Sequence, residues 1–191
     1  MIELSMHILD IVQNSLVAGS TRVEIKIQED LSGDLLKIEV KDNGRGMSKS
    51  VSSRVTDPFF TTRTTREVGL GLSLLKEAAE RCGGHLEVDS QEGLGTKIMA
   101  FFQLDHFDRA PLGDMGETLA ILITANPEVD FSYEHLVEEQ AYQLETREMR
   151  EILGPVGLDD PTVLQFIRQD VQMGLKEIGA ATFPKIMEVL R

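Results

Sequence analysis

The stretch VKDNGRGMS combines an acid with glycines in a pattern that suits a nucleotide base. Asp42 precedes Gly44, Gly46 and Met47. A carboxylate at the end of a strand can accept a hydrogen bond from an amino group such as adenine N6, and glycines let the backbone approach a flat ring closely. Met47 would offer a soft apolar surface to that ring. A plain hairpin turned by the Asn-Gly pair is the alternative, and these residues alone do not separate the two interpretations.

A second set of polar residues lies on one predicted helix, residues 2–18. Asp10 and Asn14 are four residues apart and share a face with His7 and Ala18. Asn14 can offer an oxygen to Mg²⁺, which takes few protein ligands, and Asp10 can polarise a water. A solvated face is the alternative, although the helix is apolar nearly all round, which favours burial. For His7 we favour a hydrogen-bonding role beside Asp10 over autophosphorylation.

Glycines also open a later helix, in the sequence VGLGLSLL. Gly69 and Gly71 lie at its start, with Leu70 and Leu72 beside them. The free N–H groups and the dipole of a helix N-terminus form an anion site, which suits phosphates. Close packing of the helix is an equally good cause of these glycines. The position of a third glycine is held by Leu74, so this is not a dinucleotide fingerprint.

The segment 48–68 has no hydrophobic period and is rich in Ser, Thr and Arg, with a net charge of +2. It is either a solvated loop or a lid over phosphates, in which Arg63 or Arg66 reaches the terminal one and Phe59 and Phe60 anchor the lid on the body of the protein. Thr96 opens a later strand, and its hydroxyl could support Asp42 or a bridging water. An ordinary turn threonine is the favoured interpretation on that evidence alone.

Composition narrows the function classes. The 191 residues carry a net charge of −13, so most of the surface would repel a nucleic acid. Residues 111–191 hold 6 basic and 15 acidic residues, which indicates a second part with a different role. Cys82 is the single cysteine, so no intrachain disulfide forms. Without a secretory signal or a long apolar run, we expect a cytoplasmic protein with no membrane partner.

Hydrophobic periodicity predicts the remaining elements. Two alternating segments joined by a Ser-Gly-Asp turn precede the loop, and two more follow the glycine-started helix. A linker then leads into an acidic α+β segment that either extends the first sheet or forms a separate unit. The predicted strands are 22–28, 35–41, 85–91, 95–104, 118–125, 130–137 and 141–145, and the later helices are 146–153 and 161–179.

The order of these motifs is more specific than any one of them. DIVQNSLVAG, DNGRGM, DPFFTT, GLGLS and GT follow one another over residues 4–104. This order resembles the GHKL superfamily, which includes DNA gyrase B subunits, the ninety-kilodalton heat-shock chaperone, histidine kinases and MutL proteins. The resemblance implies an α+β fold, the two-layer Bergerat sandwich, with a mixed, mostly antiparallel sheet and helices on one face. It divides the chain into an ATP-binding domain (1–105), a linker (106–117) and an α+β extension (118–191).

The resemblance also implies ATP and Mg²⁺ as cofactors and assigns roles. Asn14 resembles the magnesium-binding asparagine, Asp42 the adenine-binding aspartate, and DPFFTT the lid motif of histidine kinases. In the members that hydrolyse ATP, a glutamate stands where Asp10, one methylene shorter, stands here. The residues assigned to the nucleotide are Asn14, Ala18, Asp42, Gly44, Gly46, Met47, Phe60, Thr61, Thr62, Arg63, Gly69, Leu70, Gly71, Leu72 and Thr96, with Asp10 in catalysis.

Two functions follow from this resemblance. The first is an ATP–Mg²⁺ protein that hydrolyses ATP or phosphorylates a separate protein, since the phosphoacceptor helices of a histidine kinase would precede the point where this sequence starts. The alternative is a non-catalytic nucleotide-sensing module, whose lid and C-terminal part switch a protein partner. We expect a protein partner, contacted through 111–191, and no nucleic acid; a homodimer is an open alternative.

Overall fold

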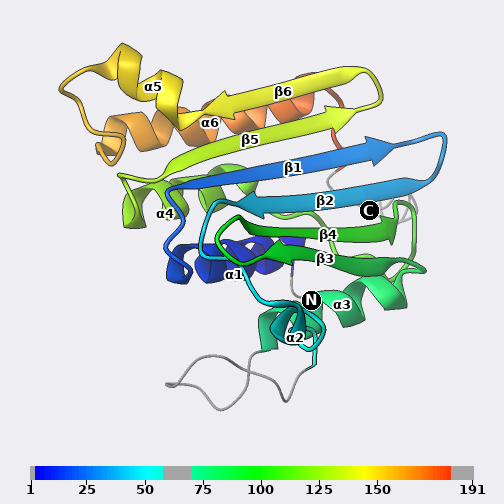
Figure 1. Ribbon diagram of the computed structural model, residues 1–191. Coiled ribbons are helices and arrows are strands. Elements are labelled where there is room, and N and C mark those ends of the chain that lie inside the picture. The colour runs from blue at the N-terminus through cyan, green and yellow to red at the C-terminus, as the bar shows by residue number, and fades with distance from the viewer. Residues whose placement is uncertain (1–2, 58–69, 182–191) are drawn as a thin grey trace.

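The computed structural model describes residues 3–57 and 70–181 (Figure 1). Helices and strands follow one another much as the periodicity predicts, with a short extra helix, α2, inside the segment expected to be a loop. The helices are α1 (Leu4–Val17), α2 (Lys49–Ser52), α3 (Leu70–Arg81), α4 (Met115–Ala125), α5 (Thr146–Leu153) and α6 (Pro161–Glu177). The strands are β1 (Arg22–Asp30), β2 (Leu35–Asp42), β3 (His85–Gln91), β4 (Gly95–Gln103), β5 (Asp130–Val137) and β6 (Gln140–Glu145).

The six strands of the described residues form one sheet, in the order β3-β4-β2-β1-β5-β6. Every neighbouring pair is antiparallel except β1 and β5, which run parallel. The parallel pair needs a crossover, which the chain makes through β2, α3, β3, β4 and α4. The prediction of an α+β fold with a mixed, mostly antiparallel sheet is therefore confirmed.

The two faces of the sheet differ in chemistry. On β1, Val23, Ile25 and Ile27 are fully buried under the helices, as the alternation of the sequence predicts. The opposite face carries cross-strand ion pairs, among them Lys26–Glu134 at 2.6 Å. Buried apolar residues of the sheet and of α1, α3, α4 and α6 form one cluster, so the core lies between one sheet face and the helices that pack on it. Figure 1 shows how these helices lie along the sheet.

Residues 118–125, predicted to be a strand, belong to helix α4, so that prediction is wrong. The Asp114 side chain caps the helix by accepting a hydrogen bond from Glu117 N at 2.9 Å. Leu119, Leu122 and Ile123 are fully buried between sheet and helices. A helix buried on most of its surface has the same continuous apolar run as a buried strand, which is why composition misled here.

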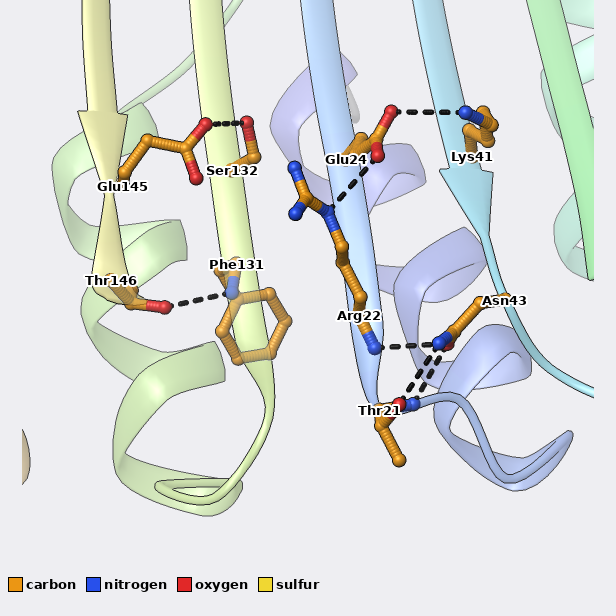
Figure 2. Close-up of polar contacts among 9 residues, drawn as sticks. All are labelled: Thr21, Arg22, Glu24, Lys41, Asn43, Phe131, Ser132, Glu145 and Thr146. Atoms are coloured by element: carbon orange, nitrogen blue, oxygen red, sulfur yellow. Dashed lines mark hydrogen bonds and ion pairs between the residues drawn. The ribbon is translucent and has the colours of Figure 1, made fainter. Parts of the chain in front are cut away.

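The acidic segment extends the first sheet, which is one of the two alternatives the sequence leaves open. β5 pairs with β1, and at the start of α5 the Thr146 hydroxyl accepts a hydrogen bond from Phe131 N at 2.8 Å (Figure 2). The connection before α4 also bonds to α1, through Leu4 N to the carbonyl oxygen of Pro111 at 3.0 Å. The division of the chain into functional units at 105 and 118 stays a prediction.

None of the helices within the described residues is both long enough and apolar enough to span a bilayer.

Candidate nucleotide-binding site

Asp42 ends strand β2 on the buried face and is 7% exposed. Its Oδ2 accepts a hydrogen bond from Ser15 Oγ at 2.7 Å, and its Oδ1 accepts one from Gly44 N at 2.8 Å. A buried carboxylate needs such donors, and these two fix its orientation. Sequence reasoning missed Ser15, although a serine inside an apolar helix, directly after Asn14, signals a hydroxyl that needs a buried partner.

Asn43 sets the direction in which the chain leaves β2. Its Oδ1 accepts hydrogen bonds from Thr21 N and Arg22 N, both at 2.9 Å, and its Nδ2 donates to Thr21 Oγ1 at 2.9 Å (Figure 2). The side chain thus closes the end of the β1–β2 pair, and the described residues that follow, 43–57, contain no strand that could pair with β2 as a hairpin. The plain-hairpin interpretation of the Asn-Gly pair is therefore wrong.

The two glycines after Asp42 are required by close backbone approach. A Cβ at Gly44 would lie 3.0 Å from the carbonyl oxygen of Ala18, which also accepts a hydrogen bond from Arg45 N at 3.0 Å. Gly46 has a φ of +64°, and a Cβ there would lie 1.9 Å from the carbonyl oxygen of Gln91. The glycines therefore allow the backbone of this loop to pack closely against the end of α1 and the β3–β4 turn, beside the site.

Thr96 lies directly opposite Asp42 in the β2–β4 register. Its hydroxyl is 2.9 Å from Ser90 Oγ, and Ser90 Oγ also accepts a hydrogen bond from Met47 N at 2.9 Å. Ser90, a second residue that sequence reasoning missed, thus joins Met47 to Thr96. In the sequence, Ser90 is one polar residue among several on a strand with polar and apolar residues in alternation, and nothing there indicates this role.

The start of α3 lies against the polar face of α1. A Cβ at Gly71 would lie 3.4 Å from Asp10 Cβ and 3.8 Å from its Oδ2. Asp10 is exposed, whereas Asn14, one turn later, is half-buried. The structure therefore brings the start of the glycine-started helix beside Asp10, the predicted catalytic residue, with Asn14 one turn further along α1.

Of the residues near the polar face of α1, some pack in the core and others remain available to the site. Leu72 is buried in the core, so its side chain packs against apolar residues, whereas Leu70 contributes the first backbone position of α3. His7 is buried on α1, and burial lowers its pKa below the ordinary value of 6.5, with Asp10 acting in the opposite direction. The predicted site residues Phe60, Thr61, Thr62, Arg63 and Gly69 lie outside the described residues.

The donor set on α1 suits Mg²⁺ bound mainly by phosphate and water. Among the described residues, no group of three or more His, Cys, Asp or Glu side chains could hold a metal by itself. Mg²⁺ at a nucleotide usually takes one or two protein oxygens and completes its octahedron with phosphates and waters. The Asn14 amide, with the Asp10 carboxylate one turn away, fits that requirement.

Residues 2–106, more than half of the chain, match the family model described as histidine kinase-, DNA gyrase B- and HSP90-like ATPase. The protein therefore belongs to this ATPase family, as the order of its motifs led us to expect.

Individual relatives include sensor kinases. The sensor histidine kinase ZraS of Escherichia coli K12 is 29% identical over 110 residues, which cover 58% of this chain and 23% of ZraS. The alginate biosynthesis sensor protein KinB of Pseudomonas aeruginosa is 34% identical over 98 residues, which cover 51% of this chain and 16% of KinB. The chain thus spans less than a quarter of the length of either protein.

A solved structure shows that the likeness in fold goes beyond the family segment. The N-terminal domain of a DNA repair protein aligns with a TM-score of 0.52 at 20% identity, over 75% of this chain and 52% of that one. Three quarters of the chain is more than residues 2–106 supply, so part of the segment after residue 106 shares this fold.

Proposed function

We propose that this protein binds ATP with Mg²⁺ in the site around Asp42 and uses it for phosphoryl chemistry. The observation that carries the proposal is the position of Asp42. It is a buried acid, oriented by Ser15 and Gly44 and faced by Thr96, with backbone brought close by Gly46. That geometry suits recognition of an adenine amino group beside a flat surface. Family membership supports the nucleotide class.

We assign the other site residues to different parts of the bound nucleotide. Asn14 would bind the magnesium ion, and the N-terminus of α3, which starts beside Gly71, would take phosphate oxygens. Asp10 lies next to Gly71 and is exposed, so it can face a reacting group. Its role is to accept the proton of the attacking water or side chain while the γ-phosphorus forms a bond to that nucleophile and ADP leaves.

Non-catalytic sensing is the second candidate, and the contacts of α1 favour it. The helix that carries Asp10, Asn14 and Ser15 is hydrogen-bonded through its first residues to the connection before α4, and β5 pairs with β1. Nucleotide binding against α1 would then alter the acidic segment 111–191, where we expect a protein partner to bind.

Nucleotide titration tests the shared part of both candidates. We expect ATP to bind with Mg²⁺ and Asp42→Asn to weaken binding strongly, because the amide presents a donor where the purine amino group needs an acceptor. Asp89→Asn, an exposed acid on β3, is the matched control and should leave affinity unchanged. Calorimetric titration of the three proteins measures this. Equal affinity of Asp42→Asn and the wild type would place the nucleotide elsewhere.

Turnover separates the two candidates. Under the catalytic proposal, Asp10→Asn abolishes phosphate release, or transfer to a partner protein, but keeps ATP affinity. Radiolabelled ATP and thin-layer chromatography follow both reactions. Intact binding with neither reaction in the wild type would contradict catalysis and support the sensing module.

A further inference from the structure

Helix α6 packs into the core on one side and contacts α4 and β6 at its flanks, which leaves its outward side exposed. Val163, Ile167 and Val171 are buried in the core. At the flanks, Arg168 pairs with Glu117 of α4, and the Tyr142 hydroxyl of β6 donates to Asp170 Oδ2 at 2.6 Å. These contacts fix how the helix is rotated about its axis, and so determine which residues face outward.

The outward side carries a regular seam. Thr162, Phe166, Gln169, Met173 and Lys176 are all exposed and follow one another at alternating spacings of four and three residues. We call these five residues the α6 seam. That spacing is the one at which two helices pack along a common line. Phe166 and Met173, each 59% exposed, are its apolar members.

The seam differs from its surroundings in charge. Residues 111–191 hold 15 acids against 6 bases, yet none of the five seam residues is acidic, and Lys176 gives the seam a positive end. Depletion of charge together with exposed aromatic and Met side chains is the composition of an interface centre. Ile152, 85% exposed at the end of α5, and Val156, 45% exposed, add apolar surface just before α6 begins.

We propose that the α6 seam binds the α6 seam of a second copy of this chain, with the two helices antiparallel. The proposal does not rest on nucleotide binding. A two-fold axis at Gln169 would place Phe166 of each copy against Met173 of the other, a favourable sulfur–aromatic contact made twice. The two Gln169 amides would meet at the axis, where each can donate to and accept from the other.

Charge complementarity selects the antiparallel arrangement over the parallel one. Lys176 lies about 10 Å along the helix from Gln169, and Thr162 lies equally far on the other side. The antiparallel pair therefore brings Lys176 to the start of the other copy's α6, beside the exposed acid Asp159. A parallel pair would instead place the two Lys176 ammonium groups together. An isologous interface requires this kind of self-complementarity.

A single helix face forms a small interface, so we expect a weak dimer. Stable interfaces bury about 800 Å² on each partner, and contacts of one helix face lie at the low end of the range. Sedimentation velocity over a series from about 1 µM to 1 mM should show a reversible monomer–dimer equilibrium. A chain that stays monomeric across the series overturns the proposal. It does so even if the seam, as judged by Phe166→Glu, turns out to bind a different protein.

Phe166→Glu places a carboxylate in the seam and should raise the dimer dissociation constant at least tenfold. Phe107→Glu, an exposed phenylalanine outside the seam, is the matched control and should leave the dimer intact. Circular dichroism shows whether each variant is folded. Dimerisation that survives Phe166→Glu in a folded protein overturns the proposal.

Disulfide trapping tests the orientation independently of folding defects. Gln169→Cys should form a disulfide-linked dimer under mild oxidation. A mixture of Thr162→Cys and Lys176→Cys should form the mixed dimer, whereas Thr162→Cys alone should not cross-link. The native Cys82 is buried and serves as the background in the wild type. Cross-linking of Thr162→Cys alone would overturn the antiparallel arrangement.

Discussion

Two acids on the same buried face of the sheet, Glu29 and Asp42, differ in what surrounds them. They lie on the neighbouring strands β1 and β2, at opposite ends of the ladder, because Asp42 pairs with Val23 and Glu29 with Leu36. Both are almost fully buried and both accept hydrogen bonds. The comparison sets a buried acid bonded to other parts of the fold against one that we propose binds a nucleotide.

At the Glu29 end, the polar groups bond to one another. The Glu29 carboxylate accepts hydrogen bonds from His135 Nε2 at 2.8 Å and from Ala181 N at 2.9 Å. His135 Nδ1 is 2.9 Å from the Tyr133 hydroxyl. When the Tyr133 hydroxyl donates to His135 Nδ1 and His135 Nε2 donates to Glu29, every one of these partners is satisfied. Burial raises the pKa of Tyr133 well above its ordinary value, which keeps the hydroxyl protonated.

At the Asp42 end, the neighbours are small. Asp42 is bonded to one hydroxyl and one glycine N–H, and is faced by Thr96 across the strand pair. An ionised carboxylate has about four acceptor positions, so these two donors leave capacity for a further donor. The Glu29 carboxylate is thus bonded to His135 and to the distant Ala181 N, whereas Asp42 lies among Gly, Ser and Thr residues, the arrangement that we propose receives a ligand.

The largest effect is expected at the Glu29 end. Glu29→Ala leaves two donors, His135 Nε2 and Ala181 N, without their acceptor. At about 1–3 kcal/mol for each unsatisfied donor, the unfolding free energy should fall by about 2–6 kcal/mol. Glu24→Ala, on the solvent-facing side of the same strand, is the matched control. Glu24 pairs with Arg22 and Lys41 in largely exposed contacts, worth at most about 1 kcal/mol (Figure 2). Urea unfolding compares the two, and similar losses would refute the structural role of Glu29.

The second effect concerns the glycines at the Asp42 end. Gly46→Ala would place a methyl group 1.9 Å from the carbonyl oxygen of Gln91 at a positive φ. Gly93 also has a positive φ, of +81°, but has no atom within 4 Å of an added Cβ. Gly93→Ala therefore reports the backbone strain alone, about 1–2 kcal/mol, and Gly46→Ala should exceed it by about 1–3 kcal/mol of overlap. Equal midpoints in urea would show that the loop can move away.

The third effect concerns two buried serines, of which both should contribute to stability but only one to ATP affinity. Ser15→Ala removes a donor to Asp42, and Ser20→Ala removes a hydrogen bond to the carbonyl oxygen of Ser15 at 2.7 Å. Each should lower the unfolding free energy by about 1 kcal/mol. If Asp42 binds the nucleotide, only Ser15→Ala should also weaken ATP binding, by roughly fivefold, which is about 1 kcal/mol. Calorimetric titration decides this, and an equal loss of affinity in both variants would remove Ser15 from the site.

The two ends were not equally predictable from the sequence. At the Asp42 end, the acid and its two glycines are close together in the chain, so a short motif such as DNGRGM indicates them, whereas Ser15 lies 27 residues away and was missed. The Glu29 end depends on His135, which lies 106 residues away. From the sequence of β1 alone, Glu29 could equally be an exposed acid near the turn that follows the strand. Its burial follows from the pairing of β1 with β5, and the register of that pairing is seen only in the folded sheet.

Strand and helix patterns were informative where one face is buried and the other is wet. They misled at 118–125, where α4 is buried on most sides. On α6 the folded structure buries only some of the residues that share one apolar pattern. Phe166 follows the helical period of Val163 and Ile167, yet it is exposed while those two are buried. A period identifies the element, but only the neighbouring elements determine how much of its surface they cover.

The smallest effect is expected from His7, a buried histidine on α1, the helix that also carries Ser15. Burial lowers its pKa below 6.5, so below that pH the unfolded chain takes up a proton that the folded protein resists. The unfolding free energy should be fully retained above about pH 6.5 and should decrease as the pH falls towards the lowered pKa. In His7→Gln this part of the pH dependence should disappear, whereas the exposed control His85→Gln should keep it. Urea midpoints from pH 7.5 to 5, with each variant compared to wild type, measure the difference. A wild type and a His7→Gln variant that lose stability in parallel across this window would show that His7 is not held neutral by the fold.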